Sequence, residues 1–319
     1  MERNRLYQAL GIVLLLAGSA ILVFGLPVRW FVPSFQYERQ GELKPGDAAF
    51  PQLESFFKAD KLLRYAVRHG GGELTLEAAE YRDSGGKVRR VLLPRPEALG
   101  KGPDAAWTAA AKAIREHTAE NALFLAWWDN GQRIHFLAGR EAWAASPVAG
   151  AFPDAGPRAF WRDAAGDFAA DPQPLAELAH WLAMDAEAAL RDMGQRLPQG
   201  RDIYFLVTTD DLARLNEMEA LAGVPLPLET RVFPGGGNFH GLIAQVKRWA
   251  QDQGEGNYLV QPLPGGDVRA WRVDDAQGSK LLLTHLLPFT ASLAHPLTDV
   301  EPVYQSENAY LTIYRWSRK

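Results

Sequence analysis

The stretch that decides the predicted fold is residues 122–140, ALFLAWWDNGQRIHFLAGR. It begins with a short apolar run, ALFLAWW, which is typical of a strand covered on both faces. The run ends at a polar turn, Asp129-Asn130-Gly131, after which apolar residues return at a helical spacing. We therefore expect a strand, a turn and a helix that Asp129 or Asn130 caps. Open α/β sheets bind ligands at the carboxyl ends of their strands, so this turn is a candidate site.

The composition indicates a mostly globular protein. The chain has 319 residues, of which 47% are hydrophobic and 23% are charged, enough for one large domain or two small ones. Its formal net charge of −4 gives no reason to expect a nucleic-acid partner. The chain contains no cysteine, which excludes disulfides, cysteine-ligated zinc, iron–sulfur clusters and the attachment of c-type haem.

The first 31 residues indicate where the chain resides. Residues 6–26 carry no charge and match the roughly 20 residues that cross a bilayer. Arg3 and Arg5 precede this run, so the positive-inside rule places the N-terminus in the cytoplasm and the bulk of the chain in the periplasm. We expect an uncleaved signal anchor in the inner membrane, within residues 1–31. The alternative is a signal peptide cleaved near Ala20, although that position lies inside the apolar run.

The rest of the chain divides into a linker and one domain. Residues 32–50 show no periodicity and are expected to form a juxtamembrane linker, and residues 51–319 a periplasmic α/β domain. Patterns of apolar residues predict helices at residues 51–69, 104–118, 175–193, 210–221 and 239–253. They predict strands at residues 73–81, 87–93, 122–128, 202–208, 228–233, 258–262, 268–273, 280–287 and 309–316. Residues 147–174, rich in Pro, Gly, Asp and Ala, are expected to form a long loop.

Strands alternate with helices in the middle of the chain and cluster at its end. This order predicts an α/β fold with a mixed sheet and flanking helices, in which the last strands pair antiparallel at one edge. The strand at residues 202–208 leads through Asp210 and Asp211 into a helix, which repeats the layout of residues 122–140. The sequence shows no boundary between two soluble domains.

The first candidate site lies between Trp127 and His135. Asp129 could act as a carboxylate, or cap a helix whose free N–H groups face a ligand, with Trp128 as an apolar wall. Alternatively, one tryptophan lies in the core, the other packs on the next helix, and Asp129 only caps the helix. The other candidates for ligand binding or docking in this segment are Asn130, Gln132, Arg133 and His135.

The second candidate site is Asp210, Asp211 and Arg214. The two acids could bind a cation, or act with Asp129 across the crevice of the sheet. Alternatively, Asp210 caps the helix and Asp211 complements its dipole, with Arg214 paired to one of them. The glycine-rich turn at residues 234–238 lacks a phosphate-binding pattern, and the seven histidines lack a zinc-binding spacing. The sequence therefore predicts no catalytic residue, metal or cofactor.

The segment WWDNGQRI, which begins at Trp127, resembles the W-W-D-x-G stretch of oligosaccharyltransferase catalytic subunits. Trp127, Trp128 and Asp129 match that stretch, whereas Asn130 replaces its usual aromatic residue. In that family the stretch contacts the acceptor sequon, so the resemblance implies a related fold and a surface that contacts a peptide or ligand. Those enzymes carry their metal and catalytic acids in a many-helix membrane domain, and this chain has one predicted span. The resemblance therefore does not imply glycosyl transfer.

The whole chain resembles the hydroxylamine oxidation protein HaoB family. The resemblance rests on the N-terminal anchor and on the segments ALFLAWWDNGQRIHFL, TTDDLARLNEMEAL and YLTIYRW. That family is encoded beside hydroxylamine oxidoreductase, a multi-haem periplasmic enzyme. The resemblance implies a non-catalytic accessory protein that tethers or organises this enzyme or a c-type cytochrome. The alternative is a ligand- or peptide-binding domain that uses the crevice at Asp129 and Asp210.

Overall fold

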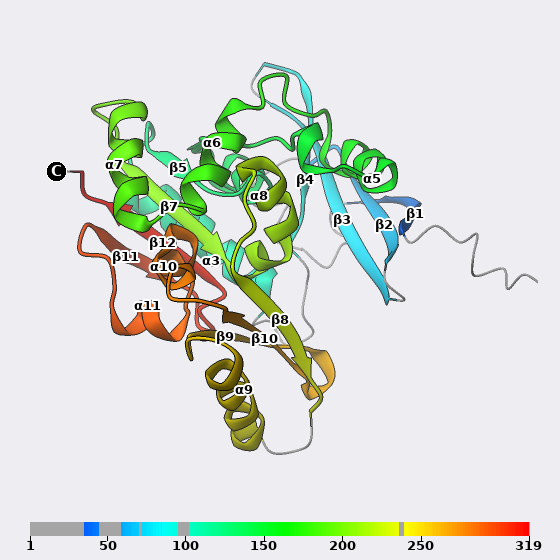
Figure 1. The fold of residues 1–319 in the computed structure, drawn as a ribbon. Helices are drawn as coiled ribbons and strands as arrows, with labels where there is room; N and C mark the ends of the chain where they lie inside the picture. The colour runs from blue at the N-terminus through cyan, green and yellow to red at the C-terminus, as the bar shows by residue number, and fades with distance from the viewer. Residues whose placement is uncertain are drawn as a thin grey trace, which may run out of the picture.

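The structure, a computed structural model, describes residues 35–44, 59–69, 72–83, 85–94, 102–235 and 239–318. These residues form a mixed α/β fold with three sheets (Figure 1). The strand orders are β11-β12-β7-β5-β6 in the central sheet, β1-β2-β3-β4 in the second and β8-β10-β9 in the third. The α/β architecture predicted from the sequence is confirmed.

The central sheet combines parallel and antiparallel pairs. β5 (Leu123–Leu125) lies between β6 (Glu141–Ala142) and β7 (Ile203–Thr208) and runs parallel to both. β12 (Leu311–Trp316) pairs antiparallel with β7, as predicted for the last strands. β11 (Val300–Gln305), which is not among the strands predicted from the apolar patterns, pairs antiparallel with β12. Because β5 and β7 run in the same direction, the segments that follow them meet at one edge of the sheet.

Both faces of the central sheet are covered at β5 and β7, which explains why these two strands are largely apolar. Phe124 and Tyr204 pack with Trp107 of α3 (Pro103–His117) on one face. Phe205 on the opposite face belongs to a larger core. The helices that contribute to this core include α6 (Gln173–Leu182), α7 (Ala186–Arg196) and α10 (Leu282–Leu286).

The second sheet is antiparallel and packs against α5 (Ala155–Ala165). Phe160 of α5 makes ring contacts with Phe35, Tyr37 and Tyr65, with centroids 5.3 to 5.9 Å apart. The sheet contains β1 (Phe35–Leu43), β2 (Lys61–His69), β3 (Gly72–Arg82) and β4 (Val88–Leu92).

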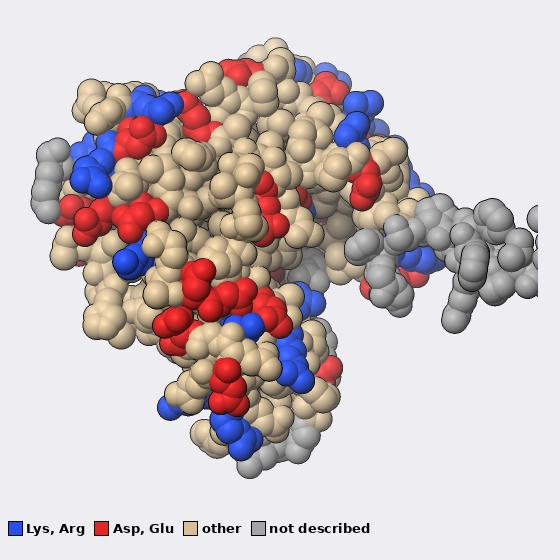
Figure 2. Space-filling view, in the orientation of Figure 1, with Lys and Arg blue, Asp and Glu red and all other residues tan. Residues whose placement is uncertain are grey.

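The third sheet carries α9 (Phe239–Gln253), and Trp249 of that helix contacts Phe233 with ring centroids 5.5 Å apart. Its strands are β8 (Leu228–Phe233), β9 (Tyr258–Pro262) and β10 (Val268–Val273). Figure 2 shows acidic side chains gathered near the start of β8 and the end of β10, where Asp274 and Asp275 are exposed. The shorter elements not yet mentioned are η5 (Ala149–Ala151), η7 (Pro264–Gly266), η8 (Gly278–Lys280) and α11 (Thr290–Ala294).

Two predicted elements change type in the structure. The helix predicted at residues 51–69 is wrong for its second half, which is strand β2. The strand predicted at residues 280–287 is instead the short helix α10. Both segments are largely apolar and mostly buried, and a short apolar run of this kind does not distinguish a helix from a strand.

Three predicted boundaries also differ. Residues 35–43, predicted as part of the linker, form strand β1 and pair with β2. The predicted loop at residues 147–174 contains α5, and the single helix predicted at residues 175–193 is two helices, α6 and α7. Asp185 separates the two helices. Its side chain accepts hydrogen bonds from the backbone N–H groups of Glu187 and Ala188 and so caps the N-terminus of α7.

In the part of the chain that the structure describes, no helix has both the length and the apolar character needed to span a bilayer. The predicted anchor at residues 6–26 lies outside the described residues.

Candidate functional site

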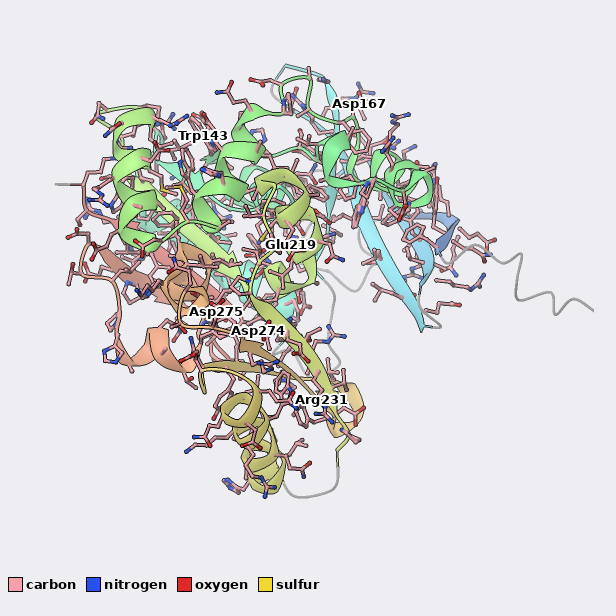
Figure 3. All side chains as sticks on the ribbon, in the orientation of Figure 1. Trp143, Asp167, Glu219, Arg231, Asp274 and Asp275 are labelled. Atoms are coloured by element: carbon pink, nitrogen blue, oxygen red, sulfur yellow. The ribbon has the colours of Figure 1, made fainter. Side chains whose placement is uncertain are left out.

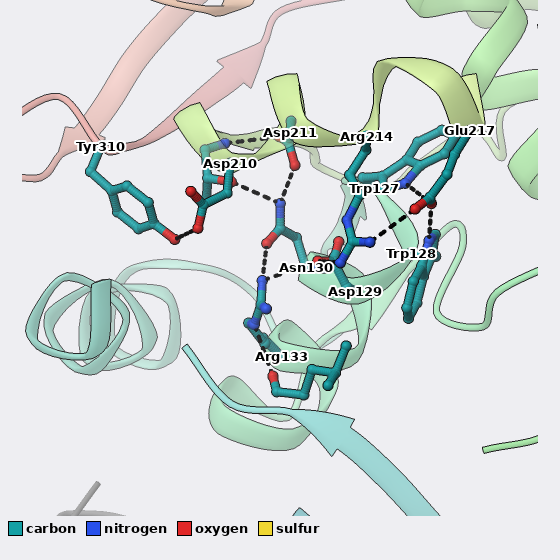
Figure 4. Close-up of polar contacts among 12 residues, drawn as sticks. Trp127, Trp128, Asp129, Asn130, Arg133, Asp210, Asp211, Arg214, Glu217 and Tyr310 are labelled. Atoms are coloured by element: carbon teal, nitrogen blue, oxygen red, sulfur yellow. Dashed lines mark hydrogen bonds and ion pairs between the residues drawn. The ribbon is translucent and has the colours of Figure 1, made fainter. Parts of the chain in front are cut away.

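The segments that follow β5 and β7 meet around the carboxylate of Asp129. Asp129 lies on α4 (Trp128–Arg133), and Arg214 ends the 3₁₀ helix η6 (Thr209–Arg214). Arg214 donates a hydrogen bond to Asp129 Oδ2 at 3.2 Å, and Nη1 of Arg133 lies 3.5 Å from the same oxygen (Figure 4). Asp129 is only 4% exposed. The carboxylate is therefore shared by two guanidinium groups inside the protein.

A second buried carboxylate, Glu217 of α8 (Leu215–Ala222), holds the two tryptophans. The indole N–H groups of Trp127 and Trp128 donate to Glu217 Oε2 at 3.2 and 2.9 Å. Arg214 donates to Glu217 Oε1 at 2.9 Å and lies over the ring of Trp161, 4.4 Å from its centroid. Because both side chains are buried and both indole N–H groups are satisfied internally, both tryptophans are part of the core. The second of the two sequence interpretations placed only one of them there.

Asn130, which is completely buried, connects the two segments. Its Nδ2 donates to Asp211 Oδ1 at 2.7 Å and to Thr208 Oγ1 at 3.3 Å, and its Oδ1 accepts from Arg133 at 2.7 Å. Arg133 also donates to the carbonyl of Leu92 at 3.0 Å, which ties α4 to the sheet that contains β4. The Asp129 network, as we call this cluster, comprises Asp129, Asn130, Arg133, Asp211, Arg214 and Glu217.

Burial and neighbouring charges move the pKa values of the two aspartates in opposite directions. Burial alone would raise the pKa of Asp129, but Arg214 and Arg133 outweigh it and hold that pKa below its usual value. Burial and the charge of Asp129 raise the pKa of Asp211 to about 8, although the backbone N–H of Thr208 opposes this shift. Near neutral pH the network therefore contains a charged Asp129 beside a largely protonated Asp211.

The remaining candidate residues lie outside this network. Asp210 accepts hydrogen bonds from the hydroxyl of Tyr310 at 2.9 Å and from Gln261 at 3.4 Å (Figure 4). These hydrogen-bond partners differ from those of Asp129. Gln132 and His135 line a separate cleft. Among the described residues, no group of three His, Cys, Asp or Glu side chains is arranged to hold a metal ion.

The predicted cap of the first helix is wrong. α4 begins at Trp128 with Trp127 as its N-cap, and it continues into a π-helical turn, η4 (Ile134–Ala138). A close backbone contact explains why position 131 is a glycine. A Cβ at this position would lie 2.0 Å from the carbonyl oxygen of Ala144. The helix therefore passes so close to the backbone beyond β6 that a residue with a Cβ does not fit at position 131.

The predicted pairing in the second segment is also wrong. Arg214 pairs with Glu217 and Asp129, and with neither Asp210 nor Asp211. Thr208 caps η6, in a capping box with Asp211. Sequence reasoning missed Glu217, although its spacing of three residues from Arg214 on a predicted helix is a usable signal for a side-chain pair.

The fold and the site together define a mixed α/β protein whose polar cluster joins two of its sheets. The chain belongs to the family described as HaoA-associated protein HaoB, whose model matches residues 3–316. Among solved structures it is similar to the C-terminal domain of C. jejuni PglB, with 10% identity, a TM-score of 0.42 and coverage of 66% of this chain and 100% of that chain.

A second similar structure is the C-terminal globular domain of an oligosaccharyltransferase from Archaeoglobus fulgidus. The identity is 13% and the TM-score 0.33, over 66% of this chain and 97% of that chain. The resemblance of the whole chain to the HaoB family is thus confirmed. No curated protein matches this chain.

Proposed function

We propose that this chain is an accessory protein of hydroxylamine oxidation that binds hydroxylamine oxidoreductase and holds it at the periplasmic face of the inner membrane. The observation that carries the proposal is the family match, which spans nearly the whole chain and describes HaoB as HaoA-associated. An apolar run at residues 6–26 is long enough to anchor the chain.

The Asp129 network supports a non-catalytic role for residues 127–135. Asp129, Arg214 and Glu217 are engaged with one another, and their hydrogen bonds join α4 to η6 and α8. A ligand that used these groups would have to break several buried charge-assisted hydrogen bonds, each of which stabilises the folded state. This cost favours the accessory role over ligand binding at Asp129 and Asp210.

Affinity purification from native membranes tests the proposed function. The tagged full chain is extracted in mild detergent, and the eluate is examined by haem stain and mass spectrometry. We expect hydroxylamine oxidoreductase or a c-type cytochrome to be recovered. An eluate without any haem protein would contradict the proposal.

The anchoring part of the proposal has its own test. A chain that lacks residues 1–31 should leave the membrane fraction while still recovering the haem enzyme from solubilised membranes. Retention of this shortened chain in washed membranes would show that residues 6–26 are not the anchor.

A further inference from the structure

A cleft of about 1060 Å³ lies apart from the Asp129 network. Its walls are the start of β4, the end of η4 with β6, and the loop that follows α5. Figure 3 labels Asp167 on this loop, near the end of the β3–β4 hairpin. Typical small-molecule pockets measure about 300–1,000 Å³, so the cleft has room for an extended segment of a chain.

The cleft is lined by more cations than anions. Five Lys and Arg side chains face three carboxylates, and His135 adds a further potential cation. Lys87, His135 and Arg162 are exposed and form no ion pair with another described residue. Arg89, by contrast, is paired with Asp83 at 2.8 Å. Among the described residues that line the cleft, Lys87, Arg140 and Arg162 form no ion pair, and neither do the carboxylates of Glu120 and Asp167. This leaves a small excess of positive charge in a concave surface, which attracts an anionic partner.

Gln132 adds a second, independent feature to the wall of this cleft. The residue is only 7% exposed, and its Nε2 donates to the carbonyl of Ala165 at 3.0 Å. Its Oε1 is buried and accepts no hydrogen bond from any described residue. A buried acceptor without a donor is costly. If the Gln132 amide turns toward the cleft, a ligand that brings an N–H group can satisfy this oxygen.

We propose that this cleft is a docking groove for an extended acidic segment of a partner protein. A polypeptide offers carboxylates to Lys87 and Arg162, and it also supplies the backbone N–H donors that the Gln132 oxygen lacks. A fully deprotonated anion such as sulfate supplies negative charge but no hydrogen-bond donor. Moreover, β4 is an edge strand of its sheet among the described strands, and edge strands accept extended peptides. The inference rests on the proposed function for the identity of the partner.

Peptide titration tests the cleft without the partner. The full chain in detergent is titrated against a fluorescein-labelled decaglutamate peptide, with a glycine–serine peptide of equal length as the neutral comparison. We expect the acidic peptide alone to bind, and to bind more weakly as salt rises from about 0.01 M to about 0.1 M, because the screening length falls from about 30 Å to about 10 Å. Absence of binding, or equal binding of both peptides, would overturn the proposal.

Two matched charge variants locate the binding. K87Q/R162Q removes two exposed cations of the cleft, and K112Q/R231Q removes two exposed cations that do not line it. Arg162 and Arg231 are closely comparable, because each lies over a phenylalanine ring, at 5.4 and 5.2 Å. We expect Kd to rise about tenfold for K87Q/R162Q and to stay unchanged for K112Q/R231Q. Equal losses would overturn the proposal.

Competition and affinity purification separate the remaining outcomes. Displacement of the peptide by inorganic phosphate at comparable concentration would assign the cleft to small anions and overturn the proposal. If the unaltered chain recovers the haem enzyme and K87Q/R162Q recovers as much, the proposed function stands and the docking groove falls. If no haem protein is recovered while the peptide titration gives the expected pattern, the proposed function falls and the groove stands as a site for another acidic protein segment.

Discussion

Asp129 shows how one residue can hold several segments together. Its carboxylate is buried and accepts a hydrogen bond from Arg214, and Arg133 lies close to the same oxygen. Arg214 in turn binds Glu217, which binds both indole N–H groups. Asp129 and Glu217 balance the charges of Arg133 and Arg214, so removal of any one of these charges leaves an excess charge in the interior, which is strongly destabilising.

The first prediction concerns Asp129→Asn, which removes the charge and keeps the shape. We expect the free energy of unfolding to fall by about 3 kcal/mol, because Arg214 and Arg133 lose their shared anion. The control is Glu116→Gln on α3, where the same type of change affects an exposed carboxylate 4.0 Å from Lys112 and should cost less than about 0.5 kcal/mol. Chemical unfolding followed by tryptophan fluorescence measures both. Equal effects would refute a structural role for Asp129.

The second prediction concerns the pH dependence that Asp211 introduces. Its pKa is about 8 in the folded state against 3.8 for the free side chain, so between these values the folded state retains a proton that the unfolded state has lost. Stability due to this group therefore falls as pH rises from about 4 to about 8. Asp211→Asn cannot titrate, so from about pH 5 to about pH 8 the wild type should lose at least about 1 kcal/mol relative to this variant.

Asp129→Asn provides a second test of this titration, because the charge of Asp129 is one cause of the raised pKa of Asp211. The pKa of Asp129 itself is lowered by the folded structure, so the stability that this group contributes is present above the unfolded value of 3.8 and lost only below it. In Asp129→Asn the pKa of Asp211 should be lower than in wild type, so the stability of this variant should fall less steeply from about pH 5 to about pH 8. A constant difference between wild type and Asp211→Asn over this range would show that Asp211 is ionised in the folded protein at neutral pH.

At the scale of elements, α4 and η4 have to pass close to the backbone beyond β6. Gly131 makes this possible, since a Cβ at this position would lie 2.0 Å from the Ala144 oxygen and 3.0 Å from its carbonyl carbon. The obstacle is backbone rather than a flexible side chain, so it cannot move without shifting the segment that follows β6. The glycine thus fixes the distance between the helix that carries Asp129 and the edge of the central sheet.

The third prediction follows from this close approach. Gly131→Ala should lower the free energy of unfolding by at least about 2 kcal/mol, because the added methyl group overlaps backbone atoms. Gly194→Ala is the matched control: Gly194 lies in α7, and a Cβ added there would meet no atom within 4 Å, so alanine should stabilise the helix by about 0.5–1 kcal/mol. Thermal unfolding of both variants decides the matter, and a neutral Gly131→Ala would contradict the close packing.

Patterns of apolar residues predicted elements well where one face was clearly polar and less consistently in buried segments. The buried strands β5 and β7 were predicted as strands, but β2 and α10 were assigned the wrong type. α3, α9 and the β3–β4 hairpin have an exposed side, and the structure confirms them. β2 is covered on both faces, with Leu62 and Leu63 in different clusters of the core, so its pattern fits a helix equally well. The break between α6 and α7 was readable in principle, because Asp185 is a good N-cap residue.

At the scale of the whole molecule, the candidate site could be predicted only in part. The strand ends at residues 122–128 and 202–208 correctly placed Asp129 and Asp211 near one another. The partners could not be predicted, because Asp129 and Arg214 are 85 positions apart and no local pattern says which acid an arginine will reach. The cleft was missed for the same reason, since its cations come from β4, η4 and the region of α5.

The buried Asp129 network stabilises the fold, whereas the cleft at the surface is the proposed binding site. The Asp129 network connects the central sheet to the sheet of β1–β4 through Arg133 and the Leu92 carbonyl. The cleft opens between the same two sheets and carries cations that no described acid neutralises. A partner that docks in the cleft would therefore contact both sheets, whose relative position is fixed by the network.

Hydrogen exchange of the chain with and without purified hydroxylamine oxidoreductase tests the central claim most directly. We expect slower exchange on complex formation in three segments that line the cleft, residues 85–90, 135–146 and 162–170. Residues 208–217 should exchange slowly in both states, because the network already holds them. Unchanged exchange in all three cleft segments would contradict docking at the cleft. New protection confined to residues 127–133 and 208–217 would instead assign the binding site to the segment around Asp129.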